Sequence, residues 1–283
     1  MFNVILQFSP NLNLDLTGMI RQLRRFRAPG LALTDGNVDL RHLPINKVMD
    51  MREMLINEGV RIELYRTSMF SADATEIRAL LSNCRLLDIR LLAVDAFGAD
   101  AHRAAALIDQ LTEAAPVFGV EVAIVNRYGG PFGTPRDVAS LLQLPGKERV
   151  GLVMDPVEYL RTGVSALFDG FMGARYKNRI RALVIRDAVK NPPEVIAQTL
   201  SDIRETLPAE GQAQVKELIS ILLSHNFHGF FVLPVNSLAE TMPVESRASN
   251  AAGTASQEEK APQAEAVPGF PAHDKLVQLF LNL

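Results

Sequence analysis

Two carboxylates three residues apart are the side chains of this sequence best placed to carry chemistry. Asp155 and Glu158 follow the apolar run Gly151-Leu-Val-Met154. The run is short and apolar, as expected of a buried strand, and Pro156 cannot continue the hydrogen-bonded ladder. Polar residues at the carboxyl ends of parallel strands face the crevice where ligands bind. Asp155 and Glu158 are therefore the candidate catalytic pair, able to act as acid and base or as carboxylate ligands of a metal.

Arginines occupy similar positions after three other apolar runs. Arg66, Arg127 and Arg186 each follow a predicted strand, and the guanidinium fork matches carboxylate or phosphate oxygens. One hypothesis is a small anionic ligand held by the three arginines, with Asp155 and Asn126 contacting its hydroxyls. The alternative is a structural network in which the charges pair with one another, for example Arg186 with Asp155 or Asp187. The strand-end set is Asp35, Arg66, Asp95, Asn126, Arg127, Asp155, Glu158, Arg186 and Asp187, and from it we predict Arg66, Asp95, Asn126, Arg127, Arg186 and Asp187 as ligand-binding residues.

The elements that would position these residues repeat in a regular order. Apolar runs predict eight strands, over residues 4–8, 30–34, 60–65, 89–94, 120–125, 150–154, 180–185 and 230–233. Amphipathic segments predict helices over 16–26, 45–57, 74–86, 100–119, from Thr134-Pro135 onward, 157–176, 193–207 and 212–225. No Gly-rich dinucleotide turn follows any strand. Eight strand–helix units favour a closed (β/α)₈ barrel, formed as a single domain over residues 1–283.

One segment departs from this order. Residues 236–273 are rich in Ala, Ser, Glu, Gln and Pro and nearly lack large apolar side chains. Such a composition does not bury enough surface to offset the entropy of ordering it, so we predict a flexible insertion. The amphipathic stretch 274–283 is expected to form a last helix that closes the barrel against the first one.

Composition limits the classes of function. Charged residues make up 22% of the chain and the net charge is −3, which gives no indication of nucleic-acid binding. The apolar N-terminal run is too short to span a membrane and lacks the features of a signal peptide. Cys84 is the only cysteine, which excludes an intramolecular disulfide and fits a reducing compartment; we expect the cytoplasm. Its position in an apolar helical pattern predicts a core residue.

The remaining motifs are weak. The loop 128–133 is rich in glycine and could be a lid or an anion cradle, but the pattern favours a tight turn into the helix that starts at Thr134-Pro135. The five histidines form no metal-binding motif. His225 and His228 flank the start of the eighth predicted strand, which places them at the opposite end of the barrel from the strand-end set.

Four segments resemble the xylose isomerase-like barrels, which include sugar-phosphate isomerases and epimerases and the type IV AP endonucleases (AP endonuclease family 2). Gly119-Val-Glu-Val-Ala-Ile-Val-Asn126 is similar to the fifth-strand pattern, and Gly151-Leu-Val-Met-Asp155 to the sixth. Leu183-Val-Ile-Arg-Asp187 is similar to the seventh-strand His-x-Lys-Asp, and Glu210-Gly211 with the run from His228 to Leu233 resembles the approach to the eighth. The resemblance implies the same barrel fold.

The resemblance also implies a metal site, and this sequence departs from it. Family members hold Mn, Mg, Co or Zn with Glu, Asp, His and Glu from these four strands. The fifth-, seventh- and eighth-strand positions are Val125, Val184 and Pro234 here, and none of these side chains can donate an electron pair. Asp155 is retained and Glu158 stands at the position of its His partner, so these two are the residual metal candidates. No cofactor is expected; the alternative is a weakly bound divalent metal.

Two functions remain open at this stage. As an isomerase or epimerase, the chain would act on a sugar, sugar phosphate or polyol through Asp155 and Glu158. As a non-catalytic barrel, it would bind such a small molecule or a partner chain without the metal site. Neither nucleic acid nor a membrane is an expected partner, and a homo-oligomer stays open.

Overall fold

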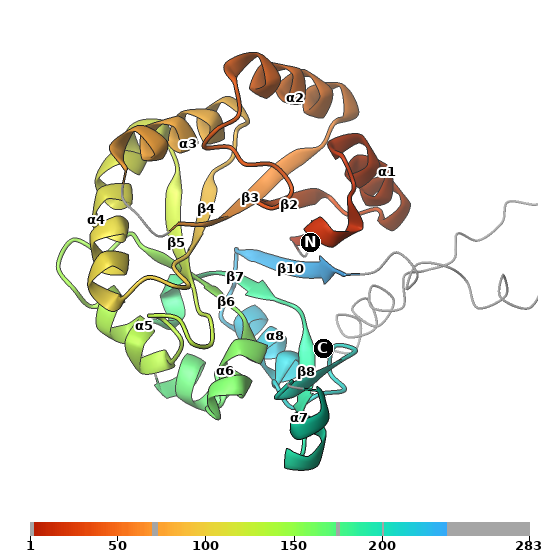
Figure 1. Ribbon diagram of the computed structural model, residues 1–283, viewed down its shortest axis with the longest axis vertical. Coiled ribbons are helices and arrows are strands. Elements are labelled where there is room, and N and C mark those ends of the chain that lie inside the picture. Colours follow the sequence, from red (N-terminus) through yellow and green to blue (C-terminus); the bar gives the residue numbers. More distant parts are fainter. Residues whose placement is uncertain (1–2, 70–72, 174–175, 200, 237–283) are drawn as a thin grey trace, which may run out of the picture.

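Eight parallel strands form a closed barrel in the computed structural model, which describes residues 3–69, 73–173, 176–199 and 201–236. The strands neighbour one another in the order β1-β10-β7-β6-β5-β4-β3-β2, and every pair is parallel (Figure 1). Their bounds are Val4–Phe8 (β1), Gly30–Thr34 (β2), Arg61–Ser68 (β3), Leu91–Asp95 (β4), Glu121–Val125 (β5), Gly151–Met154 (β6), Ile180–Val184 (β7) and Phe230–Val235 (β10). The predicted (β/α)₈ architecture is confirmed.

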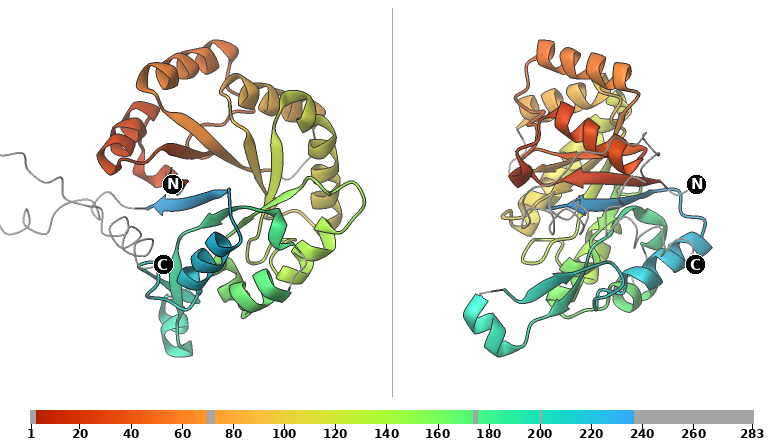
Figure 2. Two further views of the ribbon diagram at one scale, coloured as in Figure 1. Left: turned by 180° about the vertical axis from the view of Figure 1, so that it is seen from behind. Right: turned by 90° about the vertical axis from the view of Figure 1, so that its right-hand side faces the viewer.

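The helices lie outside this barrel and cover the outer faces of the strands (Figures 1 and 2). They are α1 (Leu16–Phe26), α2 (Ile45–Glu58), α3 (Ala74–Leu86), α4 (Ala101–Phe118), α5 (Pro135–Leu142), α6 (Pro156–Thr162) and α8 (Val215–Ser224), with short 3₁₀ turns η1 (Pro10–Leu12) and η3 (Lys177–Arg179). Local chemistry sets their ends. Asp73 and Asp100 accept hydrogen bonds from the first turns of α3 and α4, and Gly59 and Gly119 end α2 and α4 in the left-handed conformation.

The alternation of side chains along each strand divides the core in two. On β10, Val232 lies in the cluster that fills the barrel, whereas Phe231 and Leu233 lie in the larger cluster between strands and helices. Four alanines and several branched side chains fill the barrel, as in a packed core. Arg66 and Asp95 follow the inward-facing positions of β3 and β4 by the same two-residue period, so they are directed to the carboxyl-terminal mouth of the barrel.

The segment after β7 differs from the prediction. A helix was expected over residues 193–207, but α7 covers only Pro193–Thr199 and a strand β9 follows at Ile203–Thr206. This strand pairs antiparallel with β8 (Asp187–Lys190), and α7 projects from the barrel at the far end of the hairpin (Figure 2). Ser201 separates the two elements, since its hydroxyl donates to the Ile203 carbonyl and its own carbonyl accepts from the Asn191 side chain.

Two other predicted helices have different limits. The helical segment expected over 157–176 is α6, ended by Gly163 at φ +84°, followed by the π-helix η2 (Ala166–Gly173). The helix expected from residue 212 begins at Val215, because Gln214 adopts a left-handed conformation. Residues 237–273 of the predicted insertion, and the helix predicted over 274–283, lie outside the described residues. Among the described helices, none combines the length and the apolar character that a membrane span requires.

Candidate ligand-binding site at the barrel mouth

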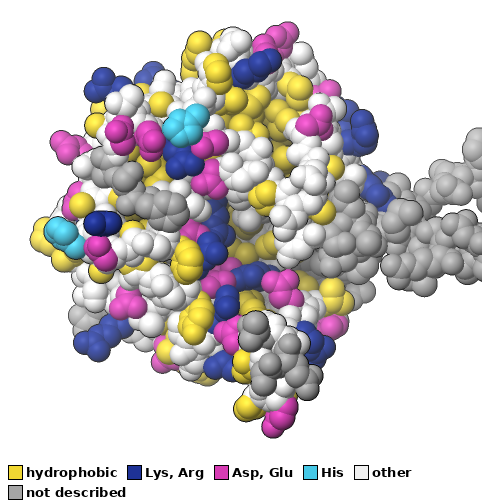
Figure 3. Space-filling view, in the orientation of Figure 1, with side chains coloured by type: hydrophobic (Ala, Val, Ile, Leu, Met, Phe, Trp, Pro, Cys, Tyr) yellow, Lys and Arg dark blue, Asp and Glu magenta, His cyan; other side chains and the backbone are white. Residues whose placement is uncertain are grey.

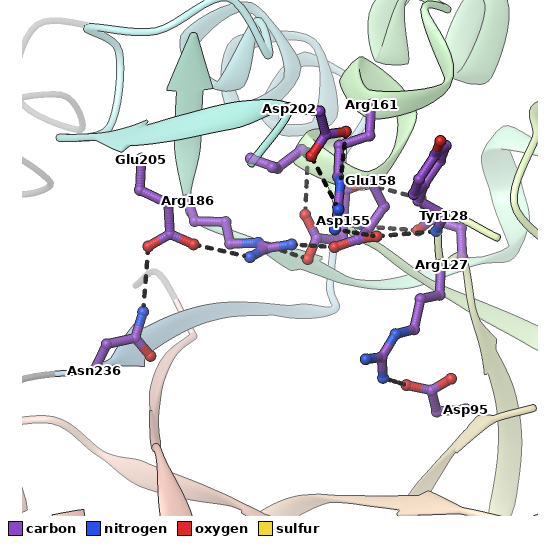
Figure 4. Close-up of polar contacts among 12 residues, drawn as sticks. Asp95, Arg127, Tyr128, Asp155, Glu158, Arg161, Arg186, Asp202, Glu205 and Asn236 are labelled. Carbon is purple, nitrogen blue, oxygen red and sulfur yellow. Dashed lines mark hydrogen bonds and ion pairs between the residues drawn. The ribbon is translucent and has the colours of Figure 1, made fainter. Parts of the chain in front are cut away.

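Arg186 is the centre of the charged network at the mouth. Its guanidinium donates from Nε to Asp155 Oδ2 at 2.8 Å and from Nη1 to Glu205 Oε1 at 3.0 Å, and its Nη2 pairs with Glu158. The carboxylates come from the end of β6, the first turn of α6 and the hairpin strand β9 (Figure 4). One cation therefore contacts three carboxylates from separate elements.

The start of α6 explains why Asp155 and Glu158 act together. Asp155 is the N-cap of α6 and accepts the backbone N–H of Val157 at 3.0 Å. Glu158 is one turn further along, so both carboxylates lie on the same side of the helix start. Glu158 also accepts the backbone N–H of Tyr128 at 2.9 Å, which ties the loop after β5 to this turn. The spacing of three residues that the sequence shows is thus the spacing that lets one guanidinium reach both.

Electrostatics fix the charge of Arg186. Burial lowers the pKa of its guanidinium, but Asp155, Glu158 and Glu205 outweigh burial and hold the pKa above its ordinary value. A second ion pair holds the hairpin: Arg161 of α6 donates from Nε to Asp202 at 3.1 Å. This hydrogen bond lowers the pKa of the Asp202 carboxyl. Glu205 and Asp202 therefore attach the hairpin to the barrel through two arginines.

A separate cluster surrounds Asp95 on the other side of the mouth. Arg66 and Arg127 both donate to Asp95 Oδ2, at 2.6 and 2.7 Å, and Asp95 Oδ1 accepts the backbone N–H of Phe97 at 3.1 Å. Burial of this carboxyl, 1% exposed, raises its pKa, but the two arginines outweigh burial and the net pKa is lowered. Arg127 also stacks over the ring of Phe97, with 4.5 Å between the guanidinium carbon and the ring centroid.

Three further strand-end residues have side chains bonded to backbone groups. Asn126 donates to the Asp155 carbonyl at 2.9 Å and accepts the Asp155 N–H at 2.7 Å, which links β5 to β6. Asp187 accepts four backbone N–H groups, from Ala188, Ala209, Gly211 and Ala213. Asp35 accepts the Ser68 N–H at 2.6 Å. The structure places these three residues at the mouth as predicted, and their polar atoms fix the positions of strands and loops.

The residues at the mouth do not fit the divalent metal that the resemblance implies. Val125 and Val184 belong to the apolar cluster inside the barrel, and Pro234 follows Val232 on the same face of β10. Asp155 and Glu158 are bound to Arg186. Across the described ranges, no group of three or more His, Cys, Asp or Glu side chains could hold a metal ion. A guanidinium stands among the carboxylates instead.

The sequence alone did not identify four members of this network: Arg161, Asp202, Glu205 and Asn236, the last of which donates to Glu205 at 3.4 Å. Asp202 and Glu205 were missed because their segment was interpreted as a helix. The segment from Asp202 to Thr206 contains a single apolar residue, Ile203, so its sequence holds no alternation that would have favoured a strand. Figure 3 shows the outcome on the face seen in Figure 1, where positive and negative side chains intermingle across the centre.

Comparison with known proteins places the fold. No protein-family model matches the chain, and no curated protein matches it by sequence. Solved structures do match. A xylose isomerase-like TIM barrel protein from Mycobacterium smegmatis in complex with magnesium superposes with a TM-score of 0.66 at 13% identity, covering 82% of this chain and 90% of that one. The chain therefore has the xylose isomerase-like TIM-barrel fold.

Two sugar epimerases are among the similar structures. D-allulose 3-epimerase from Methylomonas sp., in complex with D-allulose, superposes with a TM-score of 0.61 at 11% identity, covering 88% of this chain and 89% of that chain. An L-ribulose 3-epimerase superposes with a TM-score of 0.63 at 12% identity, covering 100% of this chain and 95% of that chain. Identities this low establish a shared fold, while the chemistry depends on the residues of the site.

Proposed function

We propose that this chain is a barrel that binds a small sugar or polyol at its mouth without the metal-dependent isomerisation of the barrels it resembles. The observation that carries the proposal is the position of Arg186 among Asp155, Glu158 and Glu205. A metal-dependent isomerase needs donors to hold a cation that polarises the substrate carbonyl. Here the carboxylates neutralise a side chain of the same protein.

The charge balance favours a neutral ligand over a sugar phosphate. Arg66 and Arg127 share Asp95, and Arg186 is surrounded by carboxylates. A phosphate would have to displace these carboxylates, at the cost of leaving buried charges unpaired. A hydroxyl can donate to a carboxylate and accept from a guanidinium at the same time, so a polyol can join the network without breaking it. The D-allulose bound to the epimerase of the same fold supports this class of ligand.

Asp155 and Glu158, the candidate acid and base, already have a hydrogen-bond partner within the protein. Both accept hydrogen bonds from Arg186, so only their remaining lone pairs can contact a substrate. A general base also needs to lie within hydrogen-bond reach of the proton that it removes. In the proposed function these two residues bind hydroxyls, together with Arg127, the most exposed of the mouth arginines with 41% of its side chain accessible.

Thermal unfolding with paired ligands tests the proposal. We expect neutral ketoses and polyols such as D-allulose to raise the melting temperature in a saturable way, and their phosphate esters to raise it less. Arg127→Gln should raise the Kd for the neutral ligand, obtained from the rise of the melting temperature, about tenfold, as expected for the loss of a charged hydrogen-bond donor. The matched control is Arg21→Gln, an exposed arginine of α1 that lies in neither site. Epimerisation of D-allulose that depends on added Mn²⁺ would overturn the proposal.

A further inference from the structure

A cavity of about 440 Å³ opens at the end of the barrel opposite the mouth. Its walls include the first residues of four strands, among them Glu121 of β5, Ile180 of β7 and Phe230 of β10. The loop between α8 and β10 forms another wall. The volume lies in the range of small-molecule sites, about 300–1,000 Å³, and no residue of the mouth network takes part.

The lining of this cavity includes six apolar residues, of which three are phenylalanines. Phe171, Phe227 and Phe230 all line it, together with the aliphatic side chains of Leu91 and Ile180. Phe171 is 1% exposed and packs edge to face against His225, with 5.6 Å between the ring centroids. Such a surface favours a flat apolar body, which can pack against the rings.

The rim of the same cavity is basic. Arg90, Lys177, Arg181, His225 and His228 line it, and Glu121 is the only acidic residue of the lining. Arg181 pairs with Glu121, so these two charges cancel. Arg90 has an exposed ion pair with Asp88 at 3.5 Å. None of the ion pairs within the described ranges involves Lys177 or His228. The rim therefore carries positive charge in excess of its acidic partners.

The loop that carries the histidines is held in place by its backbone. A Cβ at Gly229 would lie 2.2 Å from the Arg181 carbonyl oxygen, so only glycine permits this close approach to β7. His225 Nδ1 lies 2.9 Å from the Ile221 carbonyl at the end of α8. A carbonyl oxygen can only accept, so Nδ1 donates there and the orientation of the ring is fixed. The rim is thus positioned before any ligand arrives.

We propose that this cavity binds a small organic anion with an aromatic body, of the aryl phosphate class. The anionic group lies at the rim near Lys177 and His228, and the ring lies against Phe227 and Phe230, which are only partly buried. This site is independent of the function proposed for the mouth. Cationic side chains next to an apolar, water-poor surface bind an anion more strongly than the same side chains on an open surface.

Calorimetric titration of the full chain with phenyl phosphate tests this site. We expect saturable one-to-one binding, with a Kd of about 0.1–1 mM for a ligand of this size. Inorganic phosphate, which lacks the ring, and benzyl alcohol, which lacks the charge, should each bind at least about tenfold more weakly. Equal binding of inorganic phosphate would overturn the proposal, because it would show that the aromatic floor contributes nothing.

Two variants of the rim locate the binding. Lys177→Gln and His228→Gln should each raise the Kd for phenyl phosphate about five- to tenfold, since each removes a donor to the anion. Both residues are exposed, so the melting temperature of the unliganded variants should stay near that of the wild type. Lys190→Gln, an exposed lysine of the hairpin at the mouth, is the matched control. Unchanged binding in both rim variants would overturn the assignment. The response to neutral sugars should be the same in all three, which separates this test from that of the mouth.

Discussion

The two ends of the barrel carry similar basic side chains, which are all paired with carboxylates at the mouth but only partly so at the opposite end. At the mouth, each arginine predicted to bind a ligand contacts a carboxylate. Arg66 and Arg127 share Asp95, and Arg186 contacts three carboxylates. At the opposite end, Lys177 and His228 line a cavity that three phenylalanines also line, and they take part in none of the ion pairs of the described residues. A count of charged residues therefore does not locate a binding site for an anion. What matters is whether each charge already has a partner.

The hairpin accounts for much of this difference. Glu205 of β9 and Asp202, the residue before β9, reach Arg186 and Arg161 at the mouth. The opposite end has no such hairpin among the described residues; the connection between α6 and β7 carries η2 and η3 there and lines the cavity. The arginines of the mouth therefore pair with carboxylates of the same protein. Lys177 and His228 at the opposite end form no ion pair within the described ranges, so an external anion could pair with them.

The largest effect is expected for Asp187→Ala. The change leaves four backbone N–H groups of residues 188–213 without their acceptor in a buried place. We expect the free energy of unfolding to fall by about 3–5 kcal/mol, because each unsatisfied buried donor costs about 1–3 kcal/mol. Urea denaturation measures it, with the exposed Asp50→Ala as control. A loss no larger than that of the control would show that the loop is not held by Asp187.

A somewhat smaller effect is expected for Arg186→Met. The variant leaves Asp155 and Glu158, which are 4% and 8% exposed, without their cation. Removal of one partner from a buried ion pair costs about 3–5 kcal/mol, and we expect about 3 kcal/mol because Glu205 is half exposed. Arg186→Lys keeps the charge and should lose less. Binding of phenyl phosphate at the opposite end should be unchanged; a parallel loss there would contradict the independence of the two ends.

Acid should reduce the contribution of Asp95 to the free energy of unfolding. Its pKa in the folded protein is lowered, since the two arginines outweigh burial, whereas an Asp in the unfolded chain titrates near about 3.9. The stability from this carboxylate is therefore fully present above the unfolded pKa and is lost as the pH falls through the folded pKa. At neutral pH, Asp95→Asn should lower the free energy of unfolding by about 2 kcal/mol. Denaturation curves from pH 7 to 3 should show the two proteins converge in acid, and a constant difference would contradict the assignment.

The smallest effect is expected for Glu205→Gln. Glu205 is about half exposed, and an exposed ion pair contributes about 0.2–1 kcal/mol. Global stability should hardly change, but hydrogen exchange in β8 and β9 should accelerate because one of the two attachments of the hairpin is weakened. Exchange in β4 and β5 serves as the internal reference. An equal acceleration throughout the barrel would argue against a local role.

The fold could be predicted from the sequence because its signals are local. The eight apolar runs gave all eight barrel strands, and Asp73, Asp100 and Thr134 marked helix starts that the structure confirms. Cys84 is buried in the core as predicted, and burial raises the pKa of its thiol to about 12. Strand β3 extends to Ser68, beyond its predicted end, because its polar last residues pair with Asp35 and Asp95 at the mouth.

The site could be predicted only in part, because pairing depends on contacts between distant segments. The strand-end rule placed Asp155 and Arg186 at the mouth, and their mutual pairing was one of the two alternatives that the sequence left open. Glu205 and Asp202 reach Arg186 and Arg161 because their segment belongs to the hairpin of β8 and β9. The sequence predicts a helix over residues 193–207, and a helix there leaves no such hairpin. The cavity at the opposite end could not be predicted, since its walls come from four strands, η2, η3, α8 and the loops before β4 and β10.

The most direct test is a titration of the wild-type protein with Mn²⁺, followed by thermal unfolding, with Arg186→Met measured beside it. If the residues at the mouth do not fit a metal, Mn²⁺ leaves the melting temperatures of both proteins unchanged, because no group of three or more His, Cys, Asp or Glu side chains in the described ranges could hold it. Saturable stabilisation of the wild type by one equivalent of Mn²⁺ would contradict the account.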